Sequence, residues 1–302
     1  MINVSLLAIP IALAGNASVM LGYVLQKKAT ETMEPIEKTR IRKTIKNFFT
    51  NPVWLLGLLF TTFSVPAAIF AYSYGNILLI ASINGSGLVF LSIFSYLILK
   101  EKMNVKEIVS FLLIIVGVVV SSFFSSQTYT QSSIDEFWNL YVYQPSVIFQ
   151  LILFFIATIL LVFEIVVKFS SVYSGVPNTL TAGILMSLAI INMKGWSIYF
   201  SIPISIDVTD FKFWLLGGLN MLLANIATIL MQISYQKAKA IVIVPIYHSS
   251  VLIFPTIYAV LFLREWETMS FANKMGLSFS LMLIVLGILL LIVSKEKSQK
   301  KI

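Results

Sequence analysis

Long apolar runs separated by short polar breaks recur along the whole chain. A helix rises 1.5 Å per residue and needs about 20 apolar residues to cross a hydrocarbon core of roughly 30 Å, and each run has about that length. The pattern therefore predicts an all-α, polytopic membrane protein with about nine transmembrane helices. The expected spans are residues 3–26, 52–74, 76–99, 104–125, 146–168, 179–200, 213–235, 240–263 and 269–294.

The composition narrows the class of protein further. Hydrophobic residues make up 58% of the 302 positions and charged residues 11%, against roughly a quarter charged in soluble domains. The net charge of +8 lies in short loops and forms no continuous basic stripe, so we expect no nucleic-acid partner. The chain has no Cys, and it carries no P-loop, HExxH or GxSxG motif. These absences argue against an enzyme, an ATP-driven pump and a resident cofactor.

The basic residues predict the orientation of the spans. If the loop 27–51 is cytoplasmic, the cytoplasmic segments hold 17 of the 21 Lys and Arg residues. The N-terminus is then outside and the C-terminus is cytoplasmic, in a multi-pass protein of the cell (plasma or inner) membrane. Within this loop, residues 37–49 alternate apolar and basic positions at helical spacing, which indicates an amphipathic helix on the cytoplasmic leaflet. A solvated loop is the alternative.

Two segments of the chain resemble each other. Residues 77–101 align without a gap with residues 241–265, and both segments end in a basic-acidic pair. The predicted orientation places the first pair inside and the second outside, so the two copies are inverted. Inverted repeats are typical of alternating-access transporters. We therefore divide the chain into a four-span repeat at 1–126, an external loop at 127–145 and a five-span repeat at 146–302.

The candidate site lies where the repeated helices are interrupted near mid-membrane. Asn84 and His248 occupy equivalent positions, and the His248 imidazole could bind substrate or exchange a coupling proton. Glu164 is a second candidate for coupling or ion binding, although an ion pair with Lys168 would also explain it. For Lys194 we expect the long stem to carry its charge to external water. The substrate-binding candidates, each of which could instead bond helix to helix, are Asn16, Asn84, Ser86, Asn225, Gln232, Tyr247 and His248.

Short motifs also link the chain to a known family. The sequence resembles the drug/metabolite transporter superfamily of EamA-like proteins, and most closely the NIPA-type magnesium transporters. The resemblance implies four spans in the first half and five in the second. One position departs from it, because residues 64–68 read Ser-Val-Pro-Ala-Ala where NIPA-type sequences usually carry an acidic residue. The motifs are NPVWLLG at 51–57, AY at 71–72, LKE at 99–101, PIY at 245–247 and EW at 265–266.

These observations predict a secondary transporter. Magnesium prefers hard oxygen ligands that include carboxylates, and no Asp or Glu stands at a mid-span position. We therefore expect the substrate to be a small metabolite or amphiphile, moved by alternating access, with a coupling proton or ion as a further possibility. The alternatives are a NIPA-like carrier of magnesium or another divalent cation, and a membrane scaffold or sensor without transport. Besides its substrate, the expected partner is the lipid bilayer, and a homodimer of the chain is an open alternative.

Overall fold

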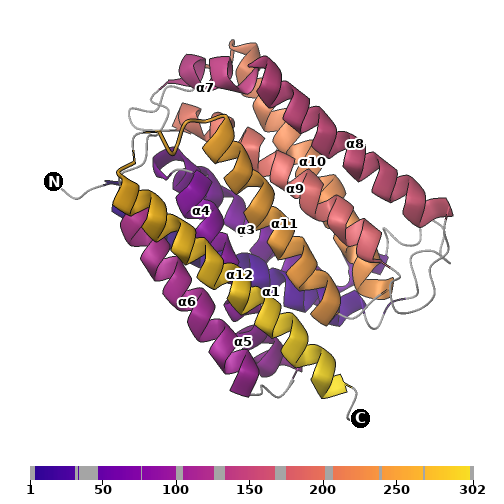
Figure 1. Ribbon diagram of the computed structural model, residues 1–302. Coiled ribbons are helices and arrows are strands. Elements are labelled where there is room, and N and C mark those ends of the chain that lie inside the picture. Colours follow the sequence, from indigo (N-terminus) through magenta and orange to yellow (C-terminus); the bar gives the residue numbers. More distant parts are fainter. Residues whose placement is uncertain are drawn as a thin grey trace.

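A bundle of long helices makes up the structure (Figure 1). The computed structural model describes residues 4–30, 33, 47–75, 77–99, 105–125, 133–166, 175–200, 207–237, 240–267 and 269–299, and this part of the chain contains no strand. The elements are α1 (Val4–Thr30), α3 (Pro52–Tyr74), α4 (Ile77–Gly85), α5 (Gly87–Leu99), α6 (Val105–Ser125), α7 (Ile134–Tyr141), α8 (Gln144–Val166), α9 (Val176–Ser197), the 3-10 turn η2 (Ile198–Phe200), α10 (Phe211–Lys237), α11 (Ala240–Leu261) and α12 (Phe271–Gln299).

The all-α membrane fold is confirmed in its coarse form. Six described segments are long and apolar enough to cross a membrane, namely α1, α3, α4 with α5, α8, α9 and α10. Shorter apolar stretches lie in α6, α11 and α12. Most of the predicted amphipathic segment, residues 37–46, lies outside the described residues.

Local sequence signals explain where α3 begins and ends. The Asn51 side chain accepts hydrogen bonds from the Val53 and Trp54 amides at 3.0 and 3.1 Å. Pro52, which has no amide hydrogen to leave unpaired, occupies the first helical position. At the other end, the Gly75 amide donates to the Ala71 carbonyl at 2.7 Å and closes the last turn. The predicted limits of this span, 52–74, agree with the structure.

The segment expected to be an external loop contains a short helix, α7, which lies across one end of the bundle (Figure 1). Ser133 caps its first turn, where Asp135 and Glu136 also stand. Its apolar side is buried on α9, because a Cβ atom at Gly195 would overlap the Phe137 ring. Sequence reasoning missed this helix, since eight residues are too short for a transmembrane signal.

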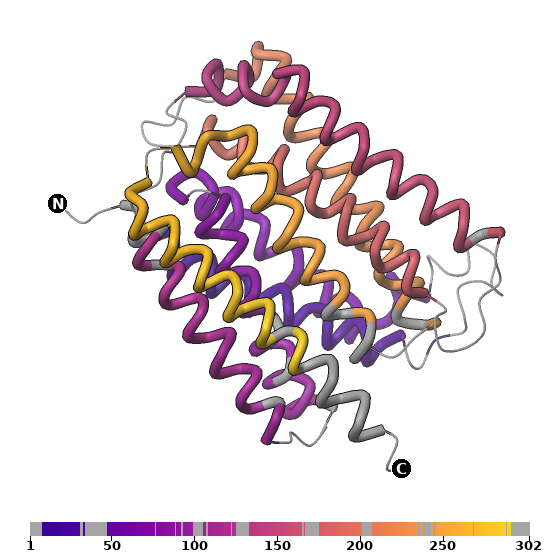
Figure 2. Tube along the Cα trace, viewed as in Figure 1, coloured from indigo at the N-terminus to yellow at the C-terminus, as the bar shows by residue number. Residues whose placement is uncertain are grey.

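Helices α6 and α12 pack along one another in opposite directions (Figure 2). A Cβ atom at Gly117 would lie 2.9 Å from the Ser280 carbonyl oxygen, and one at Gly287 would lie 2.8 Å from the Ser110 carbonyl oxygen. The two contacts are therefore equivalent under a two-fold rotation between the helices. Gly117 stands seven residues after Ser110, and Gly287 stands seven residues after Ser280. Only glycine allows the backbones to approach so closely.

The outer surface of the bundle is apolar. Leu112 on α6, Phe155 on α8 and Leu222 on α10 are all more than half exposed. Exposed apolar residues on this scale are typical of a surface that faces acyl chains. In contrast, α9 is buried nearly all round, with α8, α10 and α11 packed against it. The centre of the bundle therefore lies around α9, α11, α4 and α1.

Candidate functional site

The predicted interruption of the third span is present as a break at Ser86, between α4 and α5. The Ser86 amide and hydroxyl both donate to the Ile83 carbonyl, at 2.9 and 2.6 Å. Glycines flank the break because there is no room for larger residues. A Cβ atom at Gly87 would lie 2.9 Å from the side-chain oxygen of Asn16. The break therefore needs the Gly85-Ser86-Gly87 sequence.

Asn16 on α1 binds directly to this break. Its amide nitrogen lies 3.1 Å from the Ile83 carbonyl, 3.4 Å from the Asn84 carbonyl and 3.3 Å from the Ser86 hydroxyl. The side chain is only 8% exposed. Interrupted helices in transporters expose backbone carbonyls that can coordinate a substrate ion. The arrangement gathers two carbonyl oxygens and one hydroxyl oxygen around the Asn16 amide nitrogen, in the interior of the bundle.

The equivalent helix of the second half, α11, is continuous over Ala240–Leu261, so the interruption predicted there is wrong. It packs against both α4 and α9. Its Tyr247 and His248 are buried, and the His248 Nε2 atom has no hydrogen-bond partner among the described residues. The Ser250 carbonyl accepts a hydrogen bond from Ser187 on α9 at 3.0 Å. Each half therefore has a polar side chain on a neighbouring helix that bonds to the backbone of the repeated helix.

The predicted substrate-binding residues fall into two groups. Asn16, Ser86 and the backbone carbonyl of Asn84 meet at the helix break, and Tyr247 and His248 lie on the helix packed beside α4. The structure does not bring the other two candidates to this place. Asn225 is exposed on α10 and donates to the Met221 carbonyl of its own helix at 2.7 Å. Gln232 is buried further along α10, where it donates to Gln26 at 2.6 Å.

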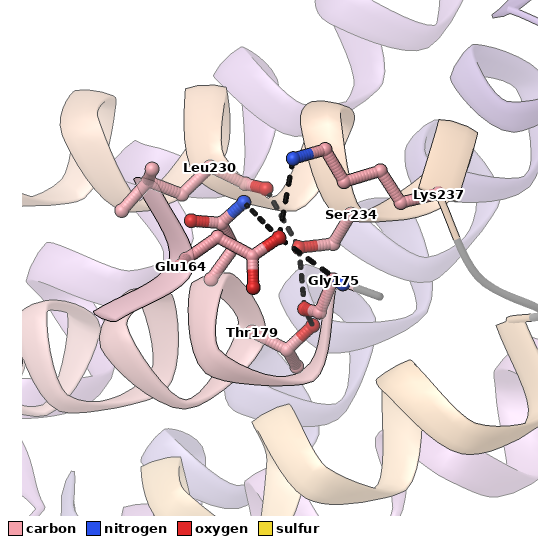
Figure 3. A network of polar contacts seen from close by, with 7 residues as sticks. Glu164, Gly175, Thr179, Leu230, Ser234 and Lys237 are labelled. Atoms are coloured by element: carbon pink, nitrogen blue, oxygen red, sulfur yellow. Dashed lines mark hydrogen bonds and ion pairs between the residues drawn. The ribbon is translucent and has the colours of Figure 1, made fainter. Parts of the chain in front are cut away.

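Glu164 belongs to an ion pair between helices (Figure 3). One of its carboxylate oxygens lies 3.1 Å from the Lys237 ammonium, and it also accepts from the Gly175 amide at 3.3 Å and the Asn178 side chain at 3.5 Å. These contacts join α8, α9 and α10. The expected partner, Lys168, lies outside the described residues. Glu164 therefore lies near the end of α8, beside the start of α9 and the end of α10, and away from the helix break.

Sequence reasoning missed a pair of buried charges at the end of the bundle where α3 meets α4. The prediction that Lys194 extends to water is wrong, because its side chain is 1% exposed and its ammonium donates to the Tyr72 and Gly75 carbonyls. Glu265, the acidic residue of the pair that ends the second repeated segment, is fully buried and accepts hydrogen bonds from the Ile77 and Leu78 amides. The low hydropathy of the α9 span was the available signal, since a span facing protein on all sides can be less apolar.

Comparisons with known proteins identify the family. The sequence profile described as "Magnesium transporter NIPA" matches residues 4–297. The chain belongs to the NIPA magnesium transporter family. NIPA relatives from Arabidopsis thaliana include the probable magnesium transporter NIPA6, which is 20% identical over 96% of this chain and 88% of its own length. The probable magnesium transporter NIPA7 is 21% identical over 85% of this chain and 79% of its own length.

A third relative matches more strongly over a shorter stretch. The probable magnesium transporter NIPA9 of Arabidopsis thaliana is 34% identical over 98 residues, which are 32% of this chain and 28% of the length of NIPA9. No solved structure matches the chain. The resemblance to the NIPA family is confirmed, and the chain is a multi-pass membrane transporter. The family match supports the divalent-cation alternative better than the metabolite that the sequence favoured.

Proposed function

We propose that this NIPA family member carries Mg²⁺ or a similar divalent cation across the cell membrane by alternating access. The observation that carries the proposal is the interrupted helix at Ser86, where oxygen atoms of Ile83, Asn84 and Ser86 gather around Asn16 inside a chain of this family. Mg²⁺ takes oxygen ligands and dehydrates reluctantly, so it keeps several of its waters in proteins. An ion that keeps its waters can be bound by neutral oxygens that accept hydrogen bonds from those waters, without a full set of carboxylate ligands.

The same proposal includes nine spans and two inverted halves. The antiparallel contact of Gly117 with α12 and of Gly287 with α6 supports it, because a two-fold axis in the membrane plane relates the ends of the two halves in this way. With α6, α11 and α12 counted as spans, the N-terminus is outside and the C-terminus is cytoplasmic. The interrupted helix of the first half and the continuous helix α11 of the second half then face the same central region.

A neutral metabolite is the second candidate. Among the described residues, no three His, Asp or Glu side chains come together as a metal site, and the groups around the helix break are uncharged. Such groups suit a solute that is bound by hydrogen bonds. The family match weighs against this candidate, and transport measurements can separate the two.

The direct test is Mg²⁺ uptake into liposomes that contain the purified protein and a Mg²⁺-sensitive dye. We expect uptake above that of protein-free liposomes, and an Asn16→Ala variant should lower the initial rate by about tenfold, as is usual when a group supporting an ion site is lost. Asn225→Ala is the matched control, because Asn225 lies on the exposed side of α10 and should leave the rate unchanged. Growth of a Mg²⁺-uptake-deficient bacterial strain gives a second readout.

Absence of Mg²⁺ uptake by folded, reconstituted protein would contradict the divalent-cation proposal. Equal rates for Asn16→Ala and Asn225→Ala would instead place the ion path elsewhere in the bundle. Stabilisation of the protein by a neutral metabolite, with no response to Mg²⁺, would favour the second candidate.

A further inference from the structure

The Lys194 and Glu265 side chains are withdrawn from water at the end of the bundle where α3 ends and α4 begins. Lys194 is 1% exposed and Glu265 is 0% exposed. Taking a charge out of water carries a large desolvation cost, and buried charges persist only where paired groups compensate for it. The groups that compensate for these two buried charges therefore indicate which ions this region can bind.

The Lys194 ammonium occupies a site made of oxygen atoms. Its Nζ atom lies 2.8 Å from the Tyr72 carbonyl and 2.7 Å from the Gly75 carbonyl. Both carbonyls belong to the end of α3, where the helix dipole places partial negative charge and where backbone acceptors lack partners within the helix. The Glu265 carboxylate adds a full negative charge nearby, and it attracts the ammonium.

Glu265 is held in place by the beginning of the next helix. One of its carboxylate oxygens accepts from the Ile77 amide at 2.9 Å and the other from the Leu78 amide at 3.0 Å. The preceding residue, Arg264, has a φ of 57°, a left-handed conformation that residues other than glycine seldom adopt. The chain therefore bends sharply at Arg264, immediately before the carboxylate that is buried against α4.

We propose that this region is a divalent-cation site in which the Lys194 ammonium acts as a tethered cation. Two carbonyls hold the ammonium directly, and the Glu265 carboxylate acts on it through space. Carbonyl and carboxylate oxygens are hard ligands of the kind that Mg²⁺ and Ca²⁺ take in proteins, so the ammonium stands where such an ion would bind. The inference rests on the proposed cation transport. It adds a second position on the ion path, at the end of the bundle where α3 meets α4 and distinct from the break at Ser86.

Competition with a tethered ammonium sets how tightly this site holds an ion. An arriving divalent cation has to displace Lys194 from the Tyr72 and Gly75 carbonyls, so the apparent affinity falls by the fraction of time in which the site is free. Weak holding suits a transporter, because an ion that binds too tightly would not leave. Lys194 thereby favours release of the ion without removing its ligands.

The test measures cation binding to the purified protein without any transport. Thermal unfolding is followed at increasing MgCl₂, with NaCl at matched ionic strength as the reference. Lys194→Met removes the ammonium and keeps an apolar stem of similar length. We expect this variant to be stabilised by Mg²⁺ at concentrations about tenfold lower than the unchanged protein requires. Lys274→Met, which changes a partly buried lysine on α12, should respond as the unchanged protein does.

A second variant shows whether the oxygen ligands are the ones described. Adding Glu265→Gln to Lys194→Met removes the carboxylate and should abolish the gain in Mg²⁺ response. If Lys194→Met is obtained only when Mg²⁺ is present during purification, removal of the ion by a chelator should unfold it, which would support the site equally well. The comparison therefore does not depend on a variant that is stable without the ion.

Two results would overturn the proposal. One is an identical Mg²⁺ response in Lys194→Met and in the unchanged protein. The other is stabilisation of the variant by ammonium or methylammonium salts with no response to Mg²⁺, which would describe a site for monovalent ammonium alone. Neither result depends on uptake measurements. Failure of Mg²⁺ transport together with an intact binding response would contradict the proposed function and leave the cation site standing.

Discussion

The two ends of the helix bundle join the halves of the chain by different means. Where α3 meets α4, Lys194 and Glu265 of the second half bond to backbone groups of the first half, with both charges fully buried. At the other end, the link between halves is a neutral amide pair, Gln232 to Gln26 at 2.6 Å. The Glu164 ion pair at that end stays within the second half. Among the contacts of the described residues, charged side chains therefore link the halves where α3 meets α4, and an amide pair links them at the other end.

The difference matters because the two kinds of contact cost different amounts to break. Removing one partner of a buried charge pair leaves an uncompensated charge and costs about 3–5 kcal/mol. A hydrogen bond between uncharged side chains in a membrane contributes roughly 0.6–2 kcal/mol. The structure therefore represents a state in which the end with charged contacts is closed firmly, and the end with the amide pair can separate more easily.

The largest effect is expected for Glu265→Gln. The change removes the negative charge that attracts the buried Lys194 ammonium and replaces a carboxylate that accepts two amide hydrogens, so the free energy of unfolding should fall by about 3–5 kcal/mol. Denaturation by SDS, followed by tryptophan fluorescence, measures this. Glu267→Gln is the matched control, because Glu267 is exposed and pairs only with Arg264 in the described residues.

A second readout of Glu265→Gln reports opening directly. The chain has no cysteine, so Ser82→Cys provides a single thiol on α4 at a position that is 0% exposed. We expect a membrane-impermeant thiol reagent, added outside, to label this thiol faster when Glu265→Gln is also present. Unchanged labelling would show that Glu265 does not hold this end closed.

The next largest effect is expected for Lys237→Met. It removes the cation from Glu164, whose side chain is 6% exposed, but the Gly175 amide and the Asn178 side chain still donate to the carboxylate. The free energy of unfolding should fall by about 1–3 kcal/mol. Labelling at Ser82→Cys should stay unchanged, because this pair does not connect the halves. Faster labelling would contradict the contrast between the two ends.

A smaller effect is expected for Gln232→Leu. The substitution removes the amide link to Gln26 and should lower the free energy of unfolding by about 1 kcal/mol. Gln232 links the two halves at this end, so its loss should let the halves separate there. We expect the Ser82→Cys thiol to be labelled faster by a reagent added on the side that the proposed orientation makes cytoplasmic. A loss as large as that of Glu265→Gln would show that the two ends are held equally firmly.

The smallest effect is expected for Asn225→Leu. The Asn225 side chain is exposed, and among the described residues it bonds to the carbonyl of Met221 on its own helix. The free energy of unfolding should therefore change by no more than about 0.5 kcal/mol, as measured by the same SDS titration. A larger loss would mean that this face of α10 contacts another protein surface, such as a second copy of the chain.

Much of the fold was predictable because hydropathy and capping are local. The limits 52–74 follow from Asn51, Pro52 and Gly75, and the break near Asn84 follows from two glycines beside Ser86. The position of Lys194 was not predictable in this way. Whether a lysine near a helix end extends to water depends on which neighbours surround that helix, and α9 is enclosed by α8, α10 and α11.

The candidate site shows the same limit. Asn16 and Ser86 were both identified as polar residues in spans, but their contact depends on how α1 crosses α5, which no local pattern records. Asn225 has the same side-chain type as Asn16 and stands on the exposed face of its helix. The Glu164 partner is Lys237, 73 positions away, so a rule based on neighbouring turns could not find it. Residue type identified the candidates, and packing decided among them.

Helix α4 is held at both of its ends by other parts of the chain. Glu265 binds its first amides, and Asn16 binds its last carbonyls. Its nine residues form a rigid segment about 13 Å long. Because a short helix does not bend easily, movement of the segment after α11 that carries Glu265 would shift α4 along its axis. The shift would reach the carbonyls at the other end of α4, which bind Asn16. If the proposed cation site at Lys194 is correct, an ion bound there would shift the oxygen atoms around Asn16 without contacting them.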